Sequence, residues 1–251
     1  MRNSFRLLLG CPIIAILVGT GNAQAGTIIL DDFSVTQDVG LLDISGFIPS
    51  SSQTGPSSSI LGEFRDLEAL GNADNFLETR LRVDNGALSF SNNVGTLGAG
   101  LIVWDGNDNP TTVDSTGLGG IDITQSGGMG LDGIFLDILS ADLAGLELAF
   151  TVYDTNNNTS SLAQLFDTPV SSSSPLTAGF LFSDFVGNAD FTNVGAIELA
   201  IAGPEEIDAT IDLIEIGPSE SADVPEPTVS LFALVGISML GGNSLKRKTQ
   251  Q

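Results

Sequence analysis

Two short stretches carry oxygen-bearing side chains at the spacing of a calcium-binding loop. Residues 105–109 read Asp-Gly-Asn-Asp-Asn, and residues 154–158 read Asp-Thr-Asn-Asn-Asn. An EF-hand loop needs such oxygens at positions 1, 3 and 5, with glycine at position 6 and glutamate at position 12. In place of that glycine and glutamate, the first stretch has Pro110 and Thr116, and the second has Thr159 and Leu165. Neither is an EF-hand loop, and turns between strands are the alternative interpretation.

Calcium remains the one cofactor that these residues suggest. Hard cations bind carboxylate and amide oxygens, so Asp105, Asn107 and Asn109 are candidate ligands. A sandwich domain can also bind calcium through carboxylates that are scattered in the sequence. Asp31 and Asp212, near the two ends of the central region, are candidates of that kind.

Histidine, cysteine and lysine, which many enzymes use in catalysis, are absent from the central region of the sequence. The chain has no histidine and one cysteine, Cys11, so zinc sites of the His/Cys kind and His-assisted catalysis are excluded. A serine nucleophile without histidine needs a lysine, and both lysines lie in the last six residues. Paired carboxylates can hydrolyse glycosides, but no spacing singles out a pair among 31 acids. We therefore expect a protein that is not an enzyme.

Four further side chains are candidates for ligand contact. Saccharides stack on exposed aromatic rings, and the chain has one tryptophan, Trp104, and one tyrosine, Tyr153. Burial is the alternative for Trp104, whereas Tyr153 falls on the polar side of its expected strand. Arg80 and Arg82 share a polar face, where pairing with carboxylates is the alternative to ligand binding.

The charge is strongly acidic between the two ends. There are 31 acidic and 8 basic residues, which gives a formal charge of -23. Five of the basic residues lie near the termini, at Arg2, Arg6, Lys246, Arg247 and Lys248. The acidic body should repel nucleic acid. Solubility outside the cell and attraction of divalent cations are both compatible with it.

These side chains are positioned by short strands. Leu146, Leu148, Phe150 and Val152 alternate with less apolar residues, as do Ile197, Leu199 and Ile201. Residues 79–84 and 87–91 flank Asn85-Gly86, which favours a two-residue type I′ turn. That turn pairs Val83 with Leu88, and Arg82 with Ser89 on the opposite face. Further strands are expected at residues 27–33, 100–105, 134–139, 162–166 and 209–216.

Other segments read less clearly. Residues 61–70 fit a helix or a strand, and we favour a strand. Residues 49–59 and 170–175 are serine-rich and read as loops. Many short strands over residues 26–218 predict an all-β, two-sheet sandwich. Jelly-roll carbohydrate-binding modules begin and end with sequences that resemble residues 31–33 and 208–212 of this chain. The resemblance implies that the first and last strands lie close together.

Residues 1–25 have the three parts of a signal peptide. Two arginines precede an apolar run over residues 7–18, and Ala23 and Ala25 form an A-x-A cleavage site. We expect a signal helix there and a mature chain that begins at Gly26. A permanent membrane anchor and lipidation at Cys11 are the alternatives.

The C-terminus has a specific order of features. After a linker at residues 219–223 come Val224, Pro225, Glu226 and Pro227, an uncharged stretch to Leu245, and the basic cluster of Lys246, Arg247 and Lys248. Residues 227–245 number 19, and a helix of that length spans about 28 Å, enough for a transmembrane helix. The basic cluster would stay in the cytoplasm.

Residues 224–251 resemble the PEP-CTERM sorting signal of Gram-negative and cyanobacterial proteins. The resemblance implies that an exosortase recognises and removes the tail at the inner membrane, and that the protein reaches the cell surface or the medium near extracellular polysaccharide or biofilm. A plain C-terminal anchor is the alternative. The function predicted from the sequence is thus an exported, non-enzymatic surface or matrix protein, with a carbohydrate- or calcium-binding module as the alternative.

Overall fold

The computed structural model describes residues 26–41, 49–71 and 79–219. The predicted signal peptide at residues 1–25 and the sorting tail at residues 224–251, with the two helices expected there, lie outside the described residues. Within the described ranges, no helix has both the length and the apolar composition to cross a membrane.

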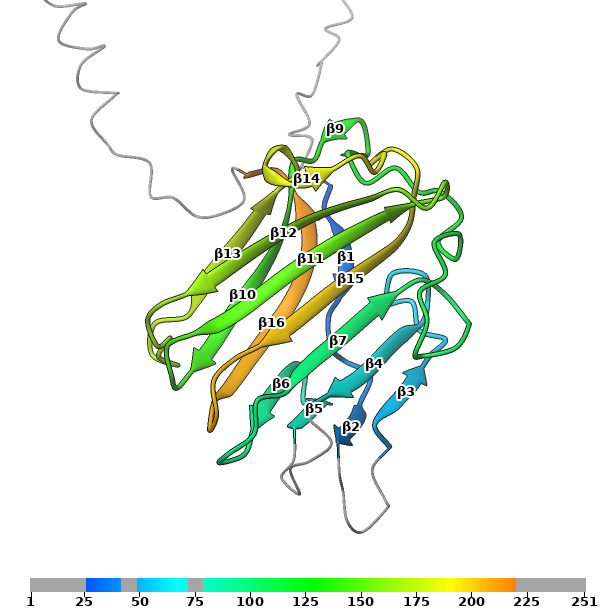
Figure 1. The fold of residues 1–251 in the computed structure, drawn as a ribbon. Coiled ribbons are helices and arrows are strands. Elements are labelled where there is room, and N and C mark those ends of the chain that lie inside the picture. The colour runs from blue at the N-terminus through cyan, green and yellow to red at the C-terminus, as the bar shows by residue number, and fades with distance from the viewer. Residues whose placement is uncertain (1–25, 42–48, 72–78, 220–251) are drawn as a thin grey trace, which may run out of the picture.

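The described chain forms two layers of antiparallel strands, a jelly-roll-like β-sandwich (Figure 1). One layer, sheet A, contains in spatial order β13 (Leu176–Leu181), β10 (Gly133–Ala141), β16 (Asp208–Gly217), β6 (Ala87–Asn92), β5 (Thr79–Asp84) and β2 (Gln37–Leu41), with β1 (Ile28–Asp31) also paired to β16. The other layer, sheet B, contains β14 (Val186–Gly187), β12 (Thr159–Phe166), β11 (Leu146–Asp154), β15 (Val194–Ala202), β7 (Ala99–Trp104), β4 (Arg65–Leu70) and β3 (Ser51–Thr54). The two-stranded ribbon of β8 (Gln125–Ser126) and β9 (Met129–Gly130) and the 3-10 turn η1 (Phe182–Asp184) complete the elements.

The apolar alternation places one face of each sheet in the core. In β11, Leu146, Leu148, Phe150 and Val152 are fully buried, whereas the residues between them are partly or fully exposed. Phe150 of sheet B meets Phe180 of sheet A edge to face, with ring centroids 4.9 Å apart. Period-two patterning therefore predicted the inner face of this strand correctly.

The hairpin predicted around Asn85-Gly86 is confirmed. Both residues have positive φ, +55° and +81°, as a type I′ turn requires. The pairing is also as predicted, with Val83 opposite Leu88 and Arg82 opposite Ser89. The first and last strands are neighbours as well, because β1 pairs with β16.

One predicted loop was wrong in part. Residues 51–54, inside the serine-rich stretch, form the edge strand β3, which pairs with β4. A polar edge strand exposes its side chains and needs few apolar residues, so its sequence resembles a loop. The favoured strand within residues 61–70 is confirmed as β4.

Candidate metal centre

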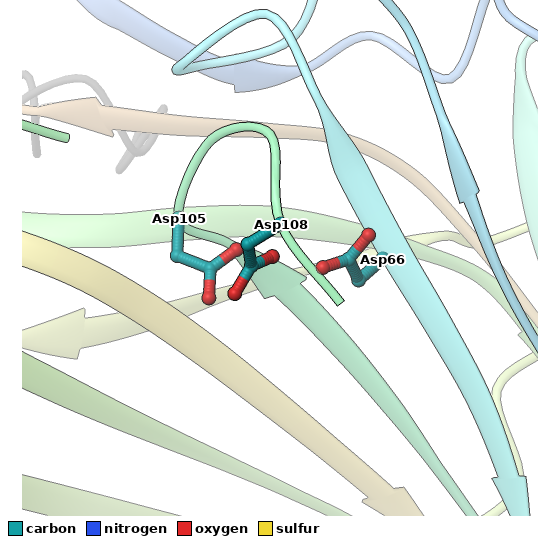
Figure 2. A group of neighbouring side chains, drawn as sticks. All are labelled: Asp66, Asp105 and Asp108. Atoms are coloured by element: carbon teal, nitrogen blue, oxygen red, sulfur yellow. The ribbon is translucent and has the colours of Figure 1, made fainter. Parts of the chain in front are cut away.

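Three aspartates from two parts of sheet B converge on one point. Asp66 lies on β4, Asp105 follows β7 directly, and Asp108 lies in the next turn. One carboxylate oxygen of each lies within 4.8 Å of the others. Figure 2 shows the side chains of Asp105 and Asp108 next to each other on the loop, with Asp66 directed toward them.

Strand alternation explains why these side chains meet on the outer side of sheet B. Asp66 pairs with Val103 across β4 and β7, so both lie on the same face. Trp104 then points into the core, and Asp105 returns to the outer side. Gly106 has φ of +92° and lets the chain turn back, which places Asp108 over the sheet.

Asp66 and Asp105 are buried, Asp108 is partly buried, and all three carboxylates are incompletely hydrogen-bonded. Asp66 and Asp105 are each 1% exposed. Both oxygens of Asp66 and one oxygen each of Asp105 and Asp108 are buried without a hydrogen-bond partner. The other oxygen of Asp105 accepts the Asp114 backbone N–H at 2.7 Å. Gln53 lies beside Asp66 and favours its charged form, but its amide is directed at the Gly106 carbonyl, to which it donates at 3.2 Å.

Burial raises the pKa of all three side chains. The pKa of Asp66 rises to about 7, mainly through desolvation, and the charges of Asp105 and Asp108 act in the same direction. Desolvation likewise raises the pKa of Asp105 to about 6, and that of Asp108 also rises. Within the described residues, the charges that raise these pKa values are those of neighbouring aspartates, and a side-chain contact with Gln53 lowers the pKa of Asp66.

Three carboxylates this close together repel one another when they are ionised. At 4.8 Å and an effective dielectric constant of about 20, each pair of ionised carboxylates repels by roughly 3.5 kcal/mol. Protons or a metal cation can remove this repulsion. Carboxylate oxygens are hard ligands that suit Ca²⁺ and Mg²⁺. The chemistry of the donor set and its orphaned oxygens therefore fit a hard divalent cation.

The site includes one of the five predicted metal ligands. Asp105 belongs to it, whereas Asn107 is exposed. Asn109 is exposed too, and its side-chain oxygen accepts the Thr111 backbone N–H at 3.2 Å. Asn109 thus shapes the turn, which is the alternative that the sequence offered.

Asp31 and Asp212 lie elsewhere. Asp31 is buried and accepts both hydrogen bonds of an ion pair with Arg65 at 2.9 and 3.0 Å, as well as one from Trp104 at 3.0 Å. That carboxylate is already neutralised, so its prediction as a metal ligand is corrected. Asp212 lies on β16 in sheet A opposite Asp137, away from the three aspartates of sheet B.

The second asparagine-rich stretch forms a closed turn. One oxygen of Asp154 accepts the backbone N–H groups of Asn156 and Asn158, each at 2.9 Å. The other accepts the Asn158 side chain at 2.8 Å and the Asp190 N–H at 3.2 Å. Because protein donors occupy this carboxylate, it is a structural cap.

The four candidates for ligand contact do not form one site. Trp104 is fully buried, so its prediction as a stacking residue is corrected. Tyr153 is partly buried on the outer face of sheet B, where its hydroxyl donates to Glu198 at 3.3 Å. Arg80 and Arg82 lie on sheet A, where Arg80 pairs with Asp38 and Arg82 pairs with Asp84 at 2.8 Å.

Two residues of the metal centre were missed from the sequence. Asp108 lies between the predicted Asn107 and Asn109, in the position that the EF-hand spacing ignores. Asp66 is far away in the sequence, and only the strand pairing brings it near Asp105. One sequence feature could have drawn attention to Asp66. It lies in a predicted strand, directly after Arg65, which is one of the few arginines.

Comparisons with known proteins find similarity at the level of solved structures. No protein-family model matches the sequence, and no curated protein matches it either. The family 11 carbohydrate-binding module of a cellulosomal cellulase of Clostridium thermocellum has a TM-score of 0.38 and 11% identity, over 78% of this chain and 97% of the module. A module named TmCBM61, in complex with β-1,4-galactotriose, has a TM-score of 0.30 and 12% identity, over 74% of this chain and 90% of the module. An agarase, AgWH50C, has a TM-score of 0.38 and 12% identity, over 78% of this chain and 25% of the enzyme. These TM-scores are too low to infer a ligand of this chain from the ligands of those proteins. The saccharides belong to the neighbouring structures alone.

Proposed function

We propose that this chain is an exported, non-enzymatic surface or matrix protein whose β-sandwich binds Ca²⁺ through Asp66, Asp105 and Asp108. The observation that carries the proposal is the set of buried carboxylate oxygens without a hydrogen-bond partner. A largely buried group of three acids, on which no basic residue of the described ranges acts, is costly unless a cation or protons neutralise it.

Calcium is the cation that these residues suit best. Ca²⁺ is bound by oxygens at about 2.3–2.6 Å, so oxygens on opposite sides of the ion lie about 5 Å apart. The separations of up to 4.8 Å between the carboxylate oxygens match that size. Mg²⁺ binds at about 2.0–2.1 Å and would need a tighter group. Three carboxylates supply part of the six to eight oxygens, and Gln53, backbone carbonyls or water can supply the others.

Export and processing rest on the sequence. The A-x-A site at Ala23 and Ala25 and the Val224–Pro227 motif with its basic end support secretion, followed by tail removal by an exosortase at the inner membrane. The same resemblance supports association with extracellular polysaccharide. The intact mass of the protein recovered outside producing cells tests this part. A chain that starts at Gly26 and lacks its last residues is expected, and a chain that keeps its tail would contradict processing.

Terbium luminescence provides a direct test of the metal site. Tb³⁺ replaces Ca²⁺ at oxygen sites, and the only tryptophan, Trp104, directly precedes Asp105. Excitation of the indole should therefore sensitise bound Tb³⁺, and Ca²⁺ should displace it. At about 100 times its Kd, Ca²⁺ should also stabilise the fold by about 2.7 kcal/mol.

Matched variants assign the signal to the site. Asp66→Asn and Asp105→Asn should abolish sensitised emission. Asp167→Asn removes the same charge from an exposed position and should leave the emission unchanged. A wild-type chain that gives no sensitised emission and no calcium-dependent stabilisation would refute calcium binding.

A further inference from the structure

The loop that carries Asp108 lies over the outer face of sheet B. We call residues 106–113 the strap. Its start is fixed where Gln53 of the edge strand β3 donates to the Gly106 carbonyl at 3.2 Å. Its end is fixed where the Asp114 N–H donates to Asp105 at 2.7 Å. Close packing supports this base, because a Cβ at Gly117 would lie 1.4 Å from the Asp105 carbonyl oxygen.

The tip of the strap is held together by its own hydrogen bonds. The Thr112 N–H donates to the Asn109 carbonyl at 3.0 Å, and the Thr111 N–H donates to the Asn109 side chain at 3.2 Å. These bonds keep the shape of the tip but do not attach it to the sheet. Among the described residues, the tip is therefore placed against the sheet by packing and by Asp108 rather than by backbone hydrogen bonds.

The tip meets the sheet in two places. Asp108 lies beside Asp66 of β4. Beyond it, residues 110–113 close over a small cavity of about 40 Å³ with Leu101 and Val103. Val103 belongs to the outer face, yet it is only 6% exposed, because the strap covers it. The cavity has room for a few water molecules.

We infer that the cation fastens the strap onto sheet B, so that the loss of the cation releases the tip and uncovers Leu101 and Val103. This inference rests on the proposed calcium site. Two ligands, Asp66 and Asp105, belong to the sheet and its end, whereas Asp108 belongs to the strap. A cation shared among them bridges strap and sheet. Without it, two ionised carboxylates repel each other across the same contact.

The site thereby couples calcium concentration to an acidic surface. The cavity beneath the strap is also lined by Glu68 and Glu198, from β4 and β15. Release of the tip would expose these two acids together with Leu101 and Val103. Calcium would thus decide whether this part of the outer face is open or closed.

Hydrogen exchange of the purified chain, followed by mass spectrometry of peptides, tests the coupling. In Ca²⁺, peptides that cover residues 106–116 should exchange about tenfold more slowly than in EDTA. Peptides of the β5–β6 hairpin should change much less. A uniform change along the whole chain would overturn the inference, because it would indicate general stabilisation.

Two variants of the strap test whether its response to Ca²⁺ depends on Asp108. In Asp108→Asn, the response of residues 106–116 to Ca²⁺ should disappear, and exchange in EDTA should be no faster than in the wild type, because the repulsion is gone. Asn107→Ser, at an exposed position of the same strap, should keep the full response.

Terbium luminescence on the same samples distinguishes the two proposals. If Tb³⁺ binds and Ca²⁺ displaces it, but exchange of residues 106–116 is unchanged, the strap inference is wrong and calcium binding stands. If Tb³⁺ does not bind, the calcium site fails and the strap inference fails with it.

Discussion

The same two strand ends build two carboxylate sites of opposite character. Arg65 and Asp66 are consecutive in β4, and Trp104 and Asp105 are consecutive at the end of β7. Their inner members, Arg65 and Trp104, hold the buried carboxylate of Asp31. Their outer members, Asp66 and Asp105, face Asp108, and no basic residue in the part of the chain that the structure describes acts on them.

The inner site is complete within the chain. Arg65 donates to both oxygens of Asp31, to Gln37 at 2.8 Å and to the Val35 carbonyl at 2.6 Å, and it lies over the Phe33 ring. Burial raises the pKa of Asp31, but the charge of Arg65 opposes that rise. At the outer site, the neighbouring charges add to the effect of burial. Enclosure of a carboxylate therefore does not by itself distinguish a candidate metal site from an internal ion pair; the compensating donors around it do.

The largest expected effect comes from breaking the inner site. Arg65→Met keeps the volume of the side chain but leaves Asp31 buried and unpaired, which should cost about 3–5 kcal/mol of unfolding free energy. Urea unfolding measures this loss. Adding Asp31→Asn to Arg65→Met should recover part of it, because no buried charge remains. A loss below about 1 kcal/mol in the single variant would show that the inner pair is not what stabilises this end of the sandwich.

The next effect is a fall in stability with rising pH, specific to the outer site. In the cation-free chain, the pKa of Asp66 is about 7 and that of Asp105 about 6, above the ordinary value of 3.8. At a pH between the ordinary pKa of 3.8 and these raised values, the two carboxyl groups hold protons in the folded state that they have lost in the unfolded state. A group whose pKa is raised in the folded state loses its contribution to stability as the pH rises, so stability should decrease from pH ~4 to pH ~7.

Calcium should reverse that trend, because it binds the ionised carboxylates. Melting curves at several pH values, in EDTA and in Ca²⁺, measure both slopes. Asp66→Asn should flatten the EDTA curve relative to the wild type, whereas Asp167→Asn should not. Equal slopes in wild type and Asp66→Asn would show that the outer carboxylates do not govern the pH dependence.

Neutralising one outer acid should have the opposite sign to breaking the inner pair. In EDTA at pH 8, Asp66→Asn should stabilise the chain by about 1–2 kcal/mol, because it removes repulsion with Asp105 and Asp108. In Ca²⁺ the same variant should lose the stabilisation that the cation gives to the wild type. Urea unfolding under both conditions provides the measurement. Destabilisation in EDTA would mean that Asp66 has a donor in solution that compensates its charge.

Much of the fold was predictable because its signals are local. The Asn85-Gly86 turn fixes the hairpin register, and alternation in β11 fixes the face that enters the core. The inward direction of Trp104 also follows from alternation, since Ile102 two positions earlier is a core residue. The strand β3 was missed because an edge strand needs no apolar pattern.

The candidate metal centre was predictable only in part because its geometry is tertiary. Asp105 was found through its asparagine-rich loop, but the motif pointed to Asn107 and Asn109 rather than to Asp108. Asp66 reaches Asp105 through the pairing of β4 with β7, which the sequence does not specify. The same limit applies to Asp31: a carboxylate next to a strand can be a metal ligand or half of an ion pair, and the position of Arg65 decides between them.

The smallest expected effect tests whether Asn109 belongs to the outer site. Asn109 was a predicted ligand, but its side chain caps the turn by accepting hydrogen bonds from the backbone and the hydroxyl of Thr111. Asn109→Ala should cost about 0.5–1 kcal/mol of stability through those lost bonds. It should change calcium affinity, measured by displacement of Tb³⁺, by less than about twofold. A tenfold weaker affinity would correspond to about 1.4 kcal/mol and would make Asn109 a ligand after all. In that case the ligands of the outer site would come mainly from the loop that begins at Asp105. The pairing of β4 with β7, which brings Asp66 to the site, would then matter less than it does for the inner site.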